Sequence, residues 1–444
     1  MAVQVTPNPS IFDEKIQITI SNLIPFQDIT IFTYVPVSQF CHYESFAQYK
    51  ASKSGSVNMC ADACIGGSYE GVEPMGLIWS VKAFAENKRK IVRFAQGGYP
   101  QPVIYYLIVY EGRIEDIATL RAWALKKTKA PLASAQITKL YVAPGVKRIV
   151  VRENGLVGTL FLPKEKGPFP GVINLYGGYP GVLEMKSALH AANGIASLTL
   201  AYYGVEGLPK HVDDTQDVSY FEKGVEFMTQ HPQVDSRNGI GVVSICKGSI
   251  LALAMATCLK GIKCVVWVNN SVNAVCGDIK YKDRVFHDIG VEFDLPQTSE
   301  PIPIGSDYLN FLPPDFTLKK FGEELQSKNS IVPFHEQQHV SYLFIAGLDD
   351  QACPTKLTVQ LAELMLMKSK HPDYKVVKYE KTGHLIEPPF SPHAPSYFQP
   401  GKPFHVHVSC GGETTAHCKA QEDAWKVHLQ FLKEKLVPTV QSKL

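Results

Sequence analysis

The feature that most constrains this chain is a cysteine standing where an apolar run ends. Residues 241–248 read Gly-Val-Val-Ser-Ile-Cys-Lys-Gly, and helix-forming sequence follows. A strand that breaks sharply into a helix, with a nucleophile on the corner, is the elbow of the α/β-hydrolase fold. The turn is so tight that the positions two before and two after the nucleophile must be small, and here they are Ser244 and Gly248. The usual pattern is Gly-x-Ser-x-Gly, so the chain departs twice, and Cys246 replaces the nucleophilic serine.

The chain is long enough for two domains, because 444 residues exceed one ordinary domain. Residues 1–140 contain short strand candidates, such as 103–110, separated by proline and glycine clusters, which is typical of a β-sandwich. From residue 141 apolar strands alternate with helical stretches, which predicts a parallel sheet covered on both faces. We therefore expect an α/β-hydrolase catalytic domain at 141–444, closed by a helix at about 416–436.

Charge and hydropathy exclude several classes of protein. A net charge of +2 argues against a nucleic-acid partner held by bulk charge. No apolar run approaches the roughly 18 residues of a membrane span. The amino-terminal sequence has no secretory pattern, and the ten scattered cysteines predict free thiols in a reducing compartment.

The last three residues, Ser442, Lys443 and Leu444, match the peroxisomal import address. This match predicts an import receptor as partner and the peroxisome as location, with the cytosol as a second location.

The elbow needs a base, an acid that orients the base, and donors for an oxyanion. In this fold the order along the chain is nucleophile, acid, histidine. Asp350 follows a strand that ends near residue 347, and His384 follows a strand that ends near residue 379. We expect His384 to be the general base and Asp350 its acid, although the pattern alone does not choose between Asp350 and Asp349.

The oxyanion donors are expected on both sides of the nucleophile. One is the backbone N–H of Lys247, the residue after Cys246. The other comes from a glycine loop after an early strand, and Gly177 or Gly178 follows the strand at 171–175.

A thiol in this position has chemical consequences. A helix N-terminus, a neighbouring lysine and a facing histidine each favour the thiolate. Acyl transfer from a thioester to Cys246 exchanges one sulfur for another with little change in energy. The resulting acyl-enzyme is itself a thioester, which reacts well with amines and more slowly with water. The cysteine therefore favours transfer to an amine over hydrolysis.

Two groups of residues contain side chains that often bind metals, but their sequence context predicts that neither group forms a metal site. His335-Glu-Gln-Gln-His339 matches H-E-x-x-H, which binds zinc only when both histidines share a helical face. Pro333 before it and an apolar strand after it leave no room for that helix. The second group does not repeat the spacing of a known site, and it consists of His405, His407, Cys410, His417 and Cys418. We expect no cofactor, since CoA would enter as part of the substrate.

The chain resembles the family of bile acid-CoA:amino acid N-acyltransferases and type-I acyl-CoA thioesterases. The resemblance covers nearly the whole chain, in segments 23–27, 74–80, 141–146, 169–173, 243–248, 383–389, 411–413 and 421–425. It implies an immunoglobulin-like N-terminal domain before the α/β-hydrolase domain. The family's triad maps onto Cys246, Asp350 and His384. Family thioesterases share Lys247-Gly248 but carry a nucleophilic serine, whereas the N-acyltransferases carry Ser-x-Cys-x-Gly, as here.

The leading expectation is therefore an acyl-CoA:amino acid N-acyltransferase. It would pass a bile-acid or fatty acyl group from CoA to taurine or glycine. The alternative is a thioesterase that passes the acyl group to water. A third reading, an inactive protein with an acyl pocket, is disfavoured by the intact set of nucleophile, acid and base.

Overall fold

The computed structural model describes residues 1–38, 41–85, 87, 93–94, 100–290, 300–305, 317–399 and 406–437. It divides into two compact units. The first holds the described residues up to Tyr141 together with Pro388–Ala394, and the second holds Val142–Glu387 and the described residues from Pro395 onward. The sequence did not predict the return of 388–394 to the first unit. His405 and the import address at residues 442–444 lie outside the described residues.

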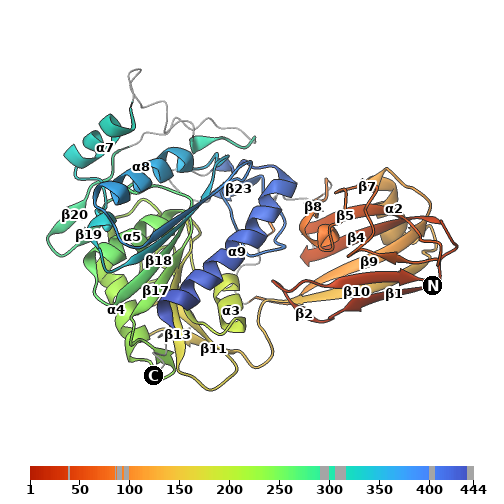
Figure 1. Ribbon diagram of the computed structural model, residues 1–444, viewed down its shortest axis with the longest axis horizontal. Coiled ribbons are helices and arrows are strands. Elements are labelled where there is room, and N and C mark those ends of the chain that lie inside the picture. The colour runs from red at the N-terminus through yellow and green to blue at the C-terminus, as the bar shows by residue number, and fades with distance from the viewer. Residues whose placement is uncertain are drawn as a thin grey trace, which may run out of the picture. The chain divides into compact units, whose positions relative to one another are not determined.

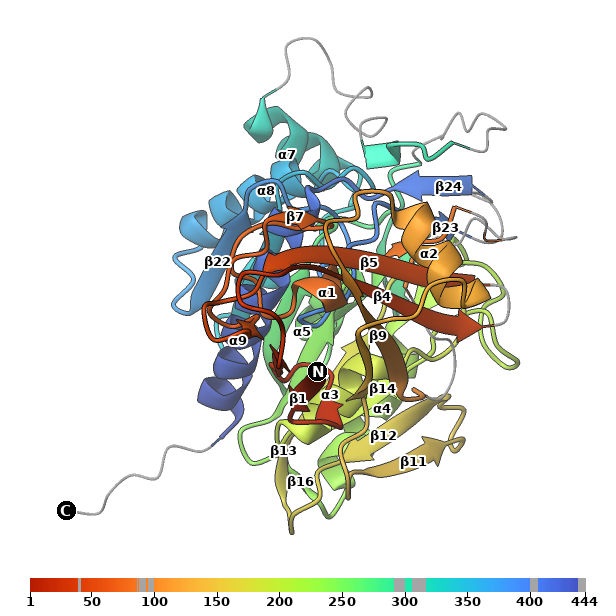
Figure 2. The ribbon, with the colours of Figure 1, turned by 90° about the vertical axis from the view of Figure 1, so that its right-hand side faces the viewer.

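The first unit consists mainly of two β-sheets. One is antiparallel with the order β1-β3-β6, and the other has the order β2-β10-β9-β4-β5-β7, with β8 paired to β5. In Figure 2, β4 and β5 run side by side with β9 beside β4. The strands are β1 Ala2–Thr6, β2 Ser10–Ile11, β3 Gln17–Ser21, β4 Asp28–Ser38, β5 Cys41–Lys50, β6 Val57–Asn58, β7 Gly66–Gly67, β8 Lys82–Ala83, β9 Val103–Glu111 and β10 Ala133–Leu140.

Alternation along these strands builds the core of the first unit. Val103, Tyr105, Leu107 and Val109 of β9 are buried, at every second position. Two helices accompany the sheets, α1 at Gly76–Trp79 and α2 at Ile117–Lys126. The sequence predicted only the strands of this unit. The carboxylate of Asp116 starts α2 by accepting hydrogen bonds from two backbone amides of its first turn.

The second unit has the α/β-hydrolase fold that the elbow predicted. Its sheet has the order β11-β12-β14-β13-β17-β18-β21-β22, antiparallel from β11 to β14 and parallel from there on. Its strands are β11 Lys147–Val151, β12 Gly158–Leu162, β13 Phe169–Leu175, β14 Ala196–Leu200, β16 Val234–Asp235 beside β13, β17 Ile240–Ser244, β18 Ile262–Val268, β21 Ser341–Gly347 and β22 Tyr374–Tyr379. Every residue of β17 and β21 is buried, as expected for strands covered on both faces.

Helices cover both faces of this sheet (Figure 1). α3 and α9 lie on one face, and α4, α5 and α8 lie on the other. The helices are α3 Met185–Ala192, α4 Val218–Gln230, α5 Lys247–Cys258, α7 Leu318–Ser327, the 3₁₀ turn η1 Phe334–Glu336, α8 Thr355–Lys368 and α9 Thr414–Leu436. α9 confirms the closing helix expected near the carboxyl end. Within the described residues, no helix combines the length and apolar character needed to cross a membrane.

Smaller strands border the main sheet. β15 Gln216–Asp217 pairs with β19 Ile279–Tyr281, which pairs with β20 Arg284–Phe286, and β23 Ser396–Gln399 pairs with β24 Val406–Ser409. All ten cysteines lie in the described part of the chain and are free thiols, as expected.

Candidate active site

Cys246 occupies the tight turn between β17 and α5. Its φ of 57° and ψ of −135° lie outside the regions that non-glycine residues normally adopt. Gly248 must lack a side chain, because a Cβ there would lie 2.6 Å from the Leu175 carbonyl oxygen. Ser244 is tolerated at the other small position because its buried hydroxyl donates to the Val266 carbonyl at 2.8 Å. The two departures from the common motif therefore leave the elbow intact.

The structure brings His384 and Asp350 together. The Nδ1 atom of His384 lies 2.9 Å from Oδ2 of Asp350, and neither side chain is exposed to solvent. The other partners of the Asp350 carboxylate are the amides of Ala352 and Cys353, each at 2.9 Å, and the Thr355 hydroxyl at 2.6 Å. These four contacts fix its direction and that of the imidazole.

Asp349, the competing acid, has a different partner. Its Oδ2 accepts a hydrogen bond from the Gly412 amide at 2.7 Å. The geometry therefore favours Asp350, and Asp349 holds the loop before α9.

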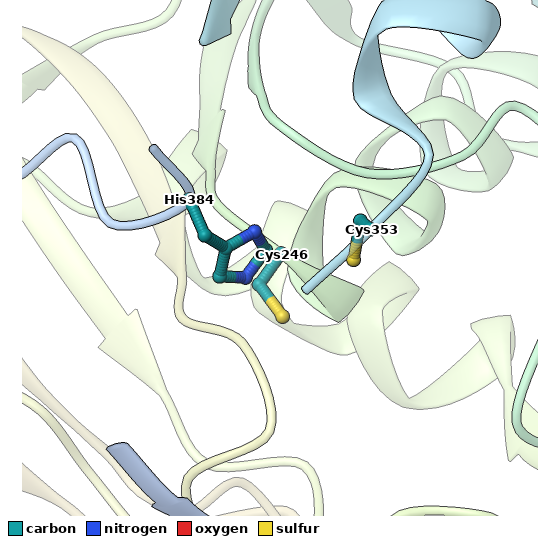
Figure 3. Close-up of side chains that lie close together, drawn as sticks. All are labelled: Cys246, Cys353 and His384. Carbon is teal, nitrogen blue, oxygen red and sulfur yellow. The ribbon is translucent and has the colours of Figure 1, made fainter. Parts of the chain in front are cut away.

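The imidazole of His384 lies beside two sulfur atoms (Figure 3). One ligand atom each from Cys246, Cys353 and His384 lie within 4.8 Å of one another. Because Nδ1 of His384 contacts Asp350, the nitrogen available to the sulfurs is Nε2. That atom is buried and has no hydrogen-bond partner among the described residues. The cluster is also the one group of three His, Cys, Asp or Glu side chains in the described part of the chain with atoms close enough to hold a metal ion.

Hydrogen bonds and charges favour the ionised pair. A hydrogen bond from the Cys353 thiol holds the pKa of Cys246 well below its ordinary value, with further help from His384 and the Gly178 amide and against the effect of burial. Burial lowers the pKa of His384, but the Asp350 carboxylate and the Cys246 thiolate outweigh it and raise this pKa to about 10. Both shifts act in the same direction and favour a thiolate beside an imidazolium.

Cys353 is a residue that the sequence reasoning missed. Its pKa is raised well above the ordinary value, first by its hydrogen bond to Cys246 and then by burial, so it is the thiol that donates. Its position three residues after Asp350, in the same loop, was the sequence signal that could have placed it in the site.

The expected oxyanion donors border the sulfur. The Gly178 amide donates to the Cys246 sulfur, so of the two glycines Gly178 has its amide directed at the nucleophile. Lys247 is the first residue of α5, and its N–H has no acceptor one turn earlier in the helix. The Lys247 ammonium is buried, which lowers its pKa, and it donates to the Cys276 carbonyl.

Position 177 must be a glycine because the side chain of Cys246 lies directly against it. A Cβ at this position would lie 2.4 Å from Cβ and 2.8 Å from Sγ of Cys246. We expect Gly177→Ala to push the loop away from the sulfur and to lower kcat by about 10²–10³, the cost of losing one oxyanion donor. The control is Gly322→Ala in α7, where the nearest atom is a side-chain methyl of Leu361 at 3.2 Å. Equal kcat in both variants, measured with an acyl-CoA, would contradict this placement of the loop.

Asn269, which follows β18, ties the loop of His384 to the sheet. Its Nδ2 donates to the carbonyls of Gly383, at 3.1 Å, and His384, at 2.5 Å. Its Oδ1 accepts from the Gly347 amide at 2.8 Å. The residue is fully buried, so a single side chain holds the ends of β18 and β21 and the base in register.

We expect Asn269→Asp to misplace His384. A carboxylate cannot donate to the two carbonyls, and each buried group left unsatisfied costs about 1–3 kcal/mol. The melting temperature should fall, and kcat should fall by about 10², the loss that a misplacement of roughly 1 Å causes. Thermal unfolding and steady-state kinetics on the same preparation test this. A variant that melts early but keeps kcat would restrict Asn269 to a structural role.

A cavity opens onto the thiolate. Its volume is about 80 Å³, and Cys246, Cys276 and Cys353 are among its lining residues. Much of the remaining lining is apolar and includes Val212, Val275, Ile304, Ala352 and Val408. An acyl chain is the kind of group that such a lining accepts.

Histidines from both groups of possible metal ligands have other surroundings in the described part of the chain. Between His335 and His339, η1 stops at Glu336, so the two histidines do not share a helix. In the second group, Nδ1 of His417 accepts from the Gly383 amide at 3.1 Å and Nε2 donates to the Leu385 carbonyl at 2.9 Å. His417 thus braces the loop of His384.

Comparison with known proteins places this site in a family. The family description "BAAT / Acyl-CoA thioester hydrolase C terminal" matches residues 216–438, and "Acyl-CoA thioester hydrolase/BAAT N-terminal region" matches residues 13–153. The chain is 35% identical over 439 residues to the bile acid-CoA:amino acid N-acyltransferase of Homo sapiens, covering 99% of both proteins. The Mus musculus protein of that name is 34% identical over 441 residues, 99% of this chain and 98% of that one.

A relative with a different name is almost as similar. Acyl-coenzyme A thioesterase 5 of Mus musculus is 33% identical over 418 residues, 94% of this chain and 92% of that one. Both family matches and the near-complete coverage lead to one conclusion: the chain belongs to the family of bile acid-CoA:amino acid N-acyltransferases and acyl-CoA thioester hydrolases.

Proposed function

We propose that this enzyme is an acyl-CoA:amino acid N-acyltransferase, which moves a bile-acid or fatty acyl group from CoA through Cys246 to taurine or glycine. The observation that carries the proposal is a cysteine, rather than a serine, at the elbow beside the buried imidazole of His384. The relatives named N-acyltransferases, at 34% and 35% identity, support it.

The first half of the reaction forms an acyl-enzyme. The Cys246 thiolate attacks the thioester carbonyl, and the oxyanion that forms accepts hydrogen bonds from the amides of Gly178 and Lys247. Collapse expels the CoA sulfur, which takes the proton of the His384 imidazolium and leaves as a thiol. The acyl group is then a thioester of Cys246, and the imidazole is neutral.

The second half returns the site to its starting state. The amine of taurine or glycine attacks the acyl-enzyme while neutral His384 accepts a proton from the nitrogen. Collapse expels the Cys246 thiolate and releases an amide. The thiolate and imidazolium are restored, so no proton is gained or lost by the enzyme over the cycle.

Hydrolysis of the same acyl-enzyme is the second candidate. The relatives named thioesterases, at 32–33% identity over most of the chain, favour it. In that case His384 would activate water instead of the amine, and the products would be the free acid and CoA.

Product analysis separates the two. Purified protein is incubated with a bile-acyl-CoA or a long-chain fatty acyl-CoA, with and without taurine or glycine, and the products are identified by mass. An amide that forms only with the amine supports the transferase. Free acid alone, at the same rate with and without amine, supports the thioesterase. Location in the peroxisome stays a prediction from residues 442–444.

A further inference from the structure

A second cysteine lies beside the nucleophile. The base of a Cys–His pair needs one sulfur, yet Cys353 places another next to Cys246. The three ligand atoms come from the elbow after β17, the loop after β21 and the loop after β22, which all meet at the carboxyl edge of the sheet. Two thiols and one imidazole form the Cys₂His set found in zinc sites that keep a fourth position open.

The environment of His384 matches that of a metal ligand. Histidines that bind metals almost always donate their second ring nitrogen to a carboxylate or carbonyl, which aims the first nitrogen. Here Nδ1 of His384 lies 2.9 Å from the Asp350 carboxylate. Its Nε2 is buried, without a hydrogen-bond partner among the described residues, and lies on the side of the two sulfurs. The nitrogen that would bind a metal therefore lies on the side of both sulfurs.

The separations are close to those of a tetrahedral site. Bonds of about 2.3 Å to sulfur and about 2.0 Å to nitrogen place neighbouring ligand atoms about 3.5–3.8 Å apart. The three ligand atoms lie within 4.8 Å of one another, so a contraction of at most about 1.3 Å completes the geometry. Cys246 and Cys353 both line the cavity of about 80 Å³, which leaves room for a water molecule as the fourth ligand.

We propose that Cys246, Cys353 and His384 bind a thiophilic divalent cation, Zn²⁺ foremost, and that this cation inhibits the enzyme. The cation displaces the protons of the Cys353 thiol and the His384 imidazolium, and both sulfurs become its ligands. Coordination draws electron density from the Cys246 sulfur and lowers its nucleophilicity, and His384 no longer carries the proton that the leaving CoA sulfur takes. The binding stands by itself, whereas the inhibition rests on the proposed acyl transfer.

The binding test uses Co²⁺ as a spectroscopic probe. The full-length protein, treated with chelator and thiol reductant, is titrated with Co²⁺ and then with Zn²⁺. We expect one Co²⁺ per chain with the intense visible bands of a tetrahedral site and near-ultraviolet thiolate charge transfer, all removed by Zn²⁺. Cys353→Ser should lose these bands and bind Zn²⁺ at least 100-fold more weakly, about 2.7 kcal/mol at 1.36 kcal/mol per tenfold.

The matched control is Cys276→Ser. Cys276 lines the same cavity and is a free thiol, but it is not a member of the three-residue cluster. This variant should bind Co²⁺ with the spectrum of the unmodified protein. If Cys353→Ser fails to fold by circular dichroism, His384→Asn replaces it with the same expectation. Unchanged Co²⁺ spectra and Zn²⁺ affinity in the folded variant would overturn the proposal.

The inhibition is read separately from the binding. Zn²⁺ at the concentration that fills the site should stop CoA release, and chelator should restore it fully. Filled sites with unchanged CoA release would overturn the inhibitory role. If metal-free protein releases no CoA from any acyl-CoA, the proposed function fails, while the Co²⁺ titration still decides whether the cation binds.

Discussion

Replacing Cys246 by alanine is expected to abolish the acyl-enzyme and to lower the rate of CoA release by a factor on the order of 10⁶, as when other enzymes lose their nucleophile. The reason is that the oxyanion donors and the base remain, but the sulfur that attacks the thioester carbonyl is gone. The mass of the intact protein after brief mixing with acyl-CoA should rise by one acyl group in the unmodified chain and stay constant in Cys246→Ala. A thiol reagent that follows free CoA gives the rate.

A second buried thiol controls for the loss of a core sulfur. Cys264 in β18 is fully buried, and burial raises its pKa to about 12, so it is a protonated and inert side chain. Cys264→Ala should cost some stability through a small cavity, yet it should keep acylation and CoA release. Acylation that survives in Cys246→Ala would refute the assignment of the nucleophile.

Cys246→Ser tests the chemical reason for the cysteine. An ester acyl-enzyme reacts less readily with amines than a thioester does, so the ratio of amide to free acid should fall in this variant. Serine also lacks a thiolate's low pKa and depends on His384 as a base for its own activation. An unchanged ratio would mean that the acceptor site, and not the sulfur, selects the amine.

The elbow and the triad could be predicted because the fold fixes their order and their loops. The apolar run before Cys246, and the strands before Asp350 and His384, each mark the carboxyl end of a strand. In a parallel sheet those ends share one edge. Once the strands are recognised, side chains more than a hundred residues apart fall into one site.

What could not be predicted depends on contacts between distant segments. The direction of Asp349 is set by the amide of Gly412, far along the chain. Asn269 matters because it reaches the carbonyls of Gly383 and His384. Cys353 looked like one scattered thiol among ten. No local sequence pattern marks any of these three residues, because each acts through residues that lie far away in the sequence and come close only on folding.

Asp350→Asn is expected to lower kcat by about 10⁴, the loss seen when the acid of a triad becomes an amide. The reason lies in the partners of the carboxylate. Oδ1 accepts from the amides of Ala352 and Cys353, so an asparagine must keep its oxygen there and turn its NH₂ toward His384. Nδ1 of His384 then has to accept a hydrogen bond, which moves the proton to Nε2. A neutral ring in that tautomer cannot take a proton from the attacking amine.

The same substitution should change the pH dependence in a defined direction. The Asp350 charge raises the pKa of His384, and the imidazolium in turn lowers the pKa of Cys246. A lowered thiol pKa keeps the thiolate present down to a lower pH, where it is lost as the pH falls through that value. Without the carboxylate, alkylation of Cys246 by iodoacetamide should therefore begin at a higher pH than in the unmodified enzyme.

Asp349→Asn is the matched control for both measurements. Its amide oxygen can still accept from the Gly412 amide, so the loop should hold and the alkylation profile should stay where it is. Two neighbouring carboxylates thus receive the same chemical change, and only one of them faces the imidazole. If the Asp349 variant loses as much kcat as the Asp350 variant, or if both profiles move together, the effect comes from the loop and the pairing of Asp350 with His384 is not what sustains the thiolate.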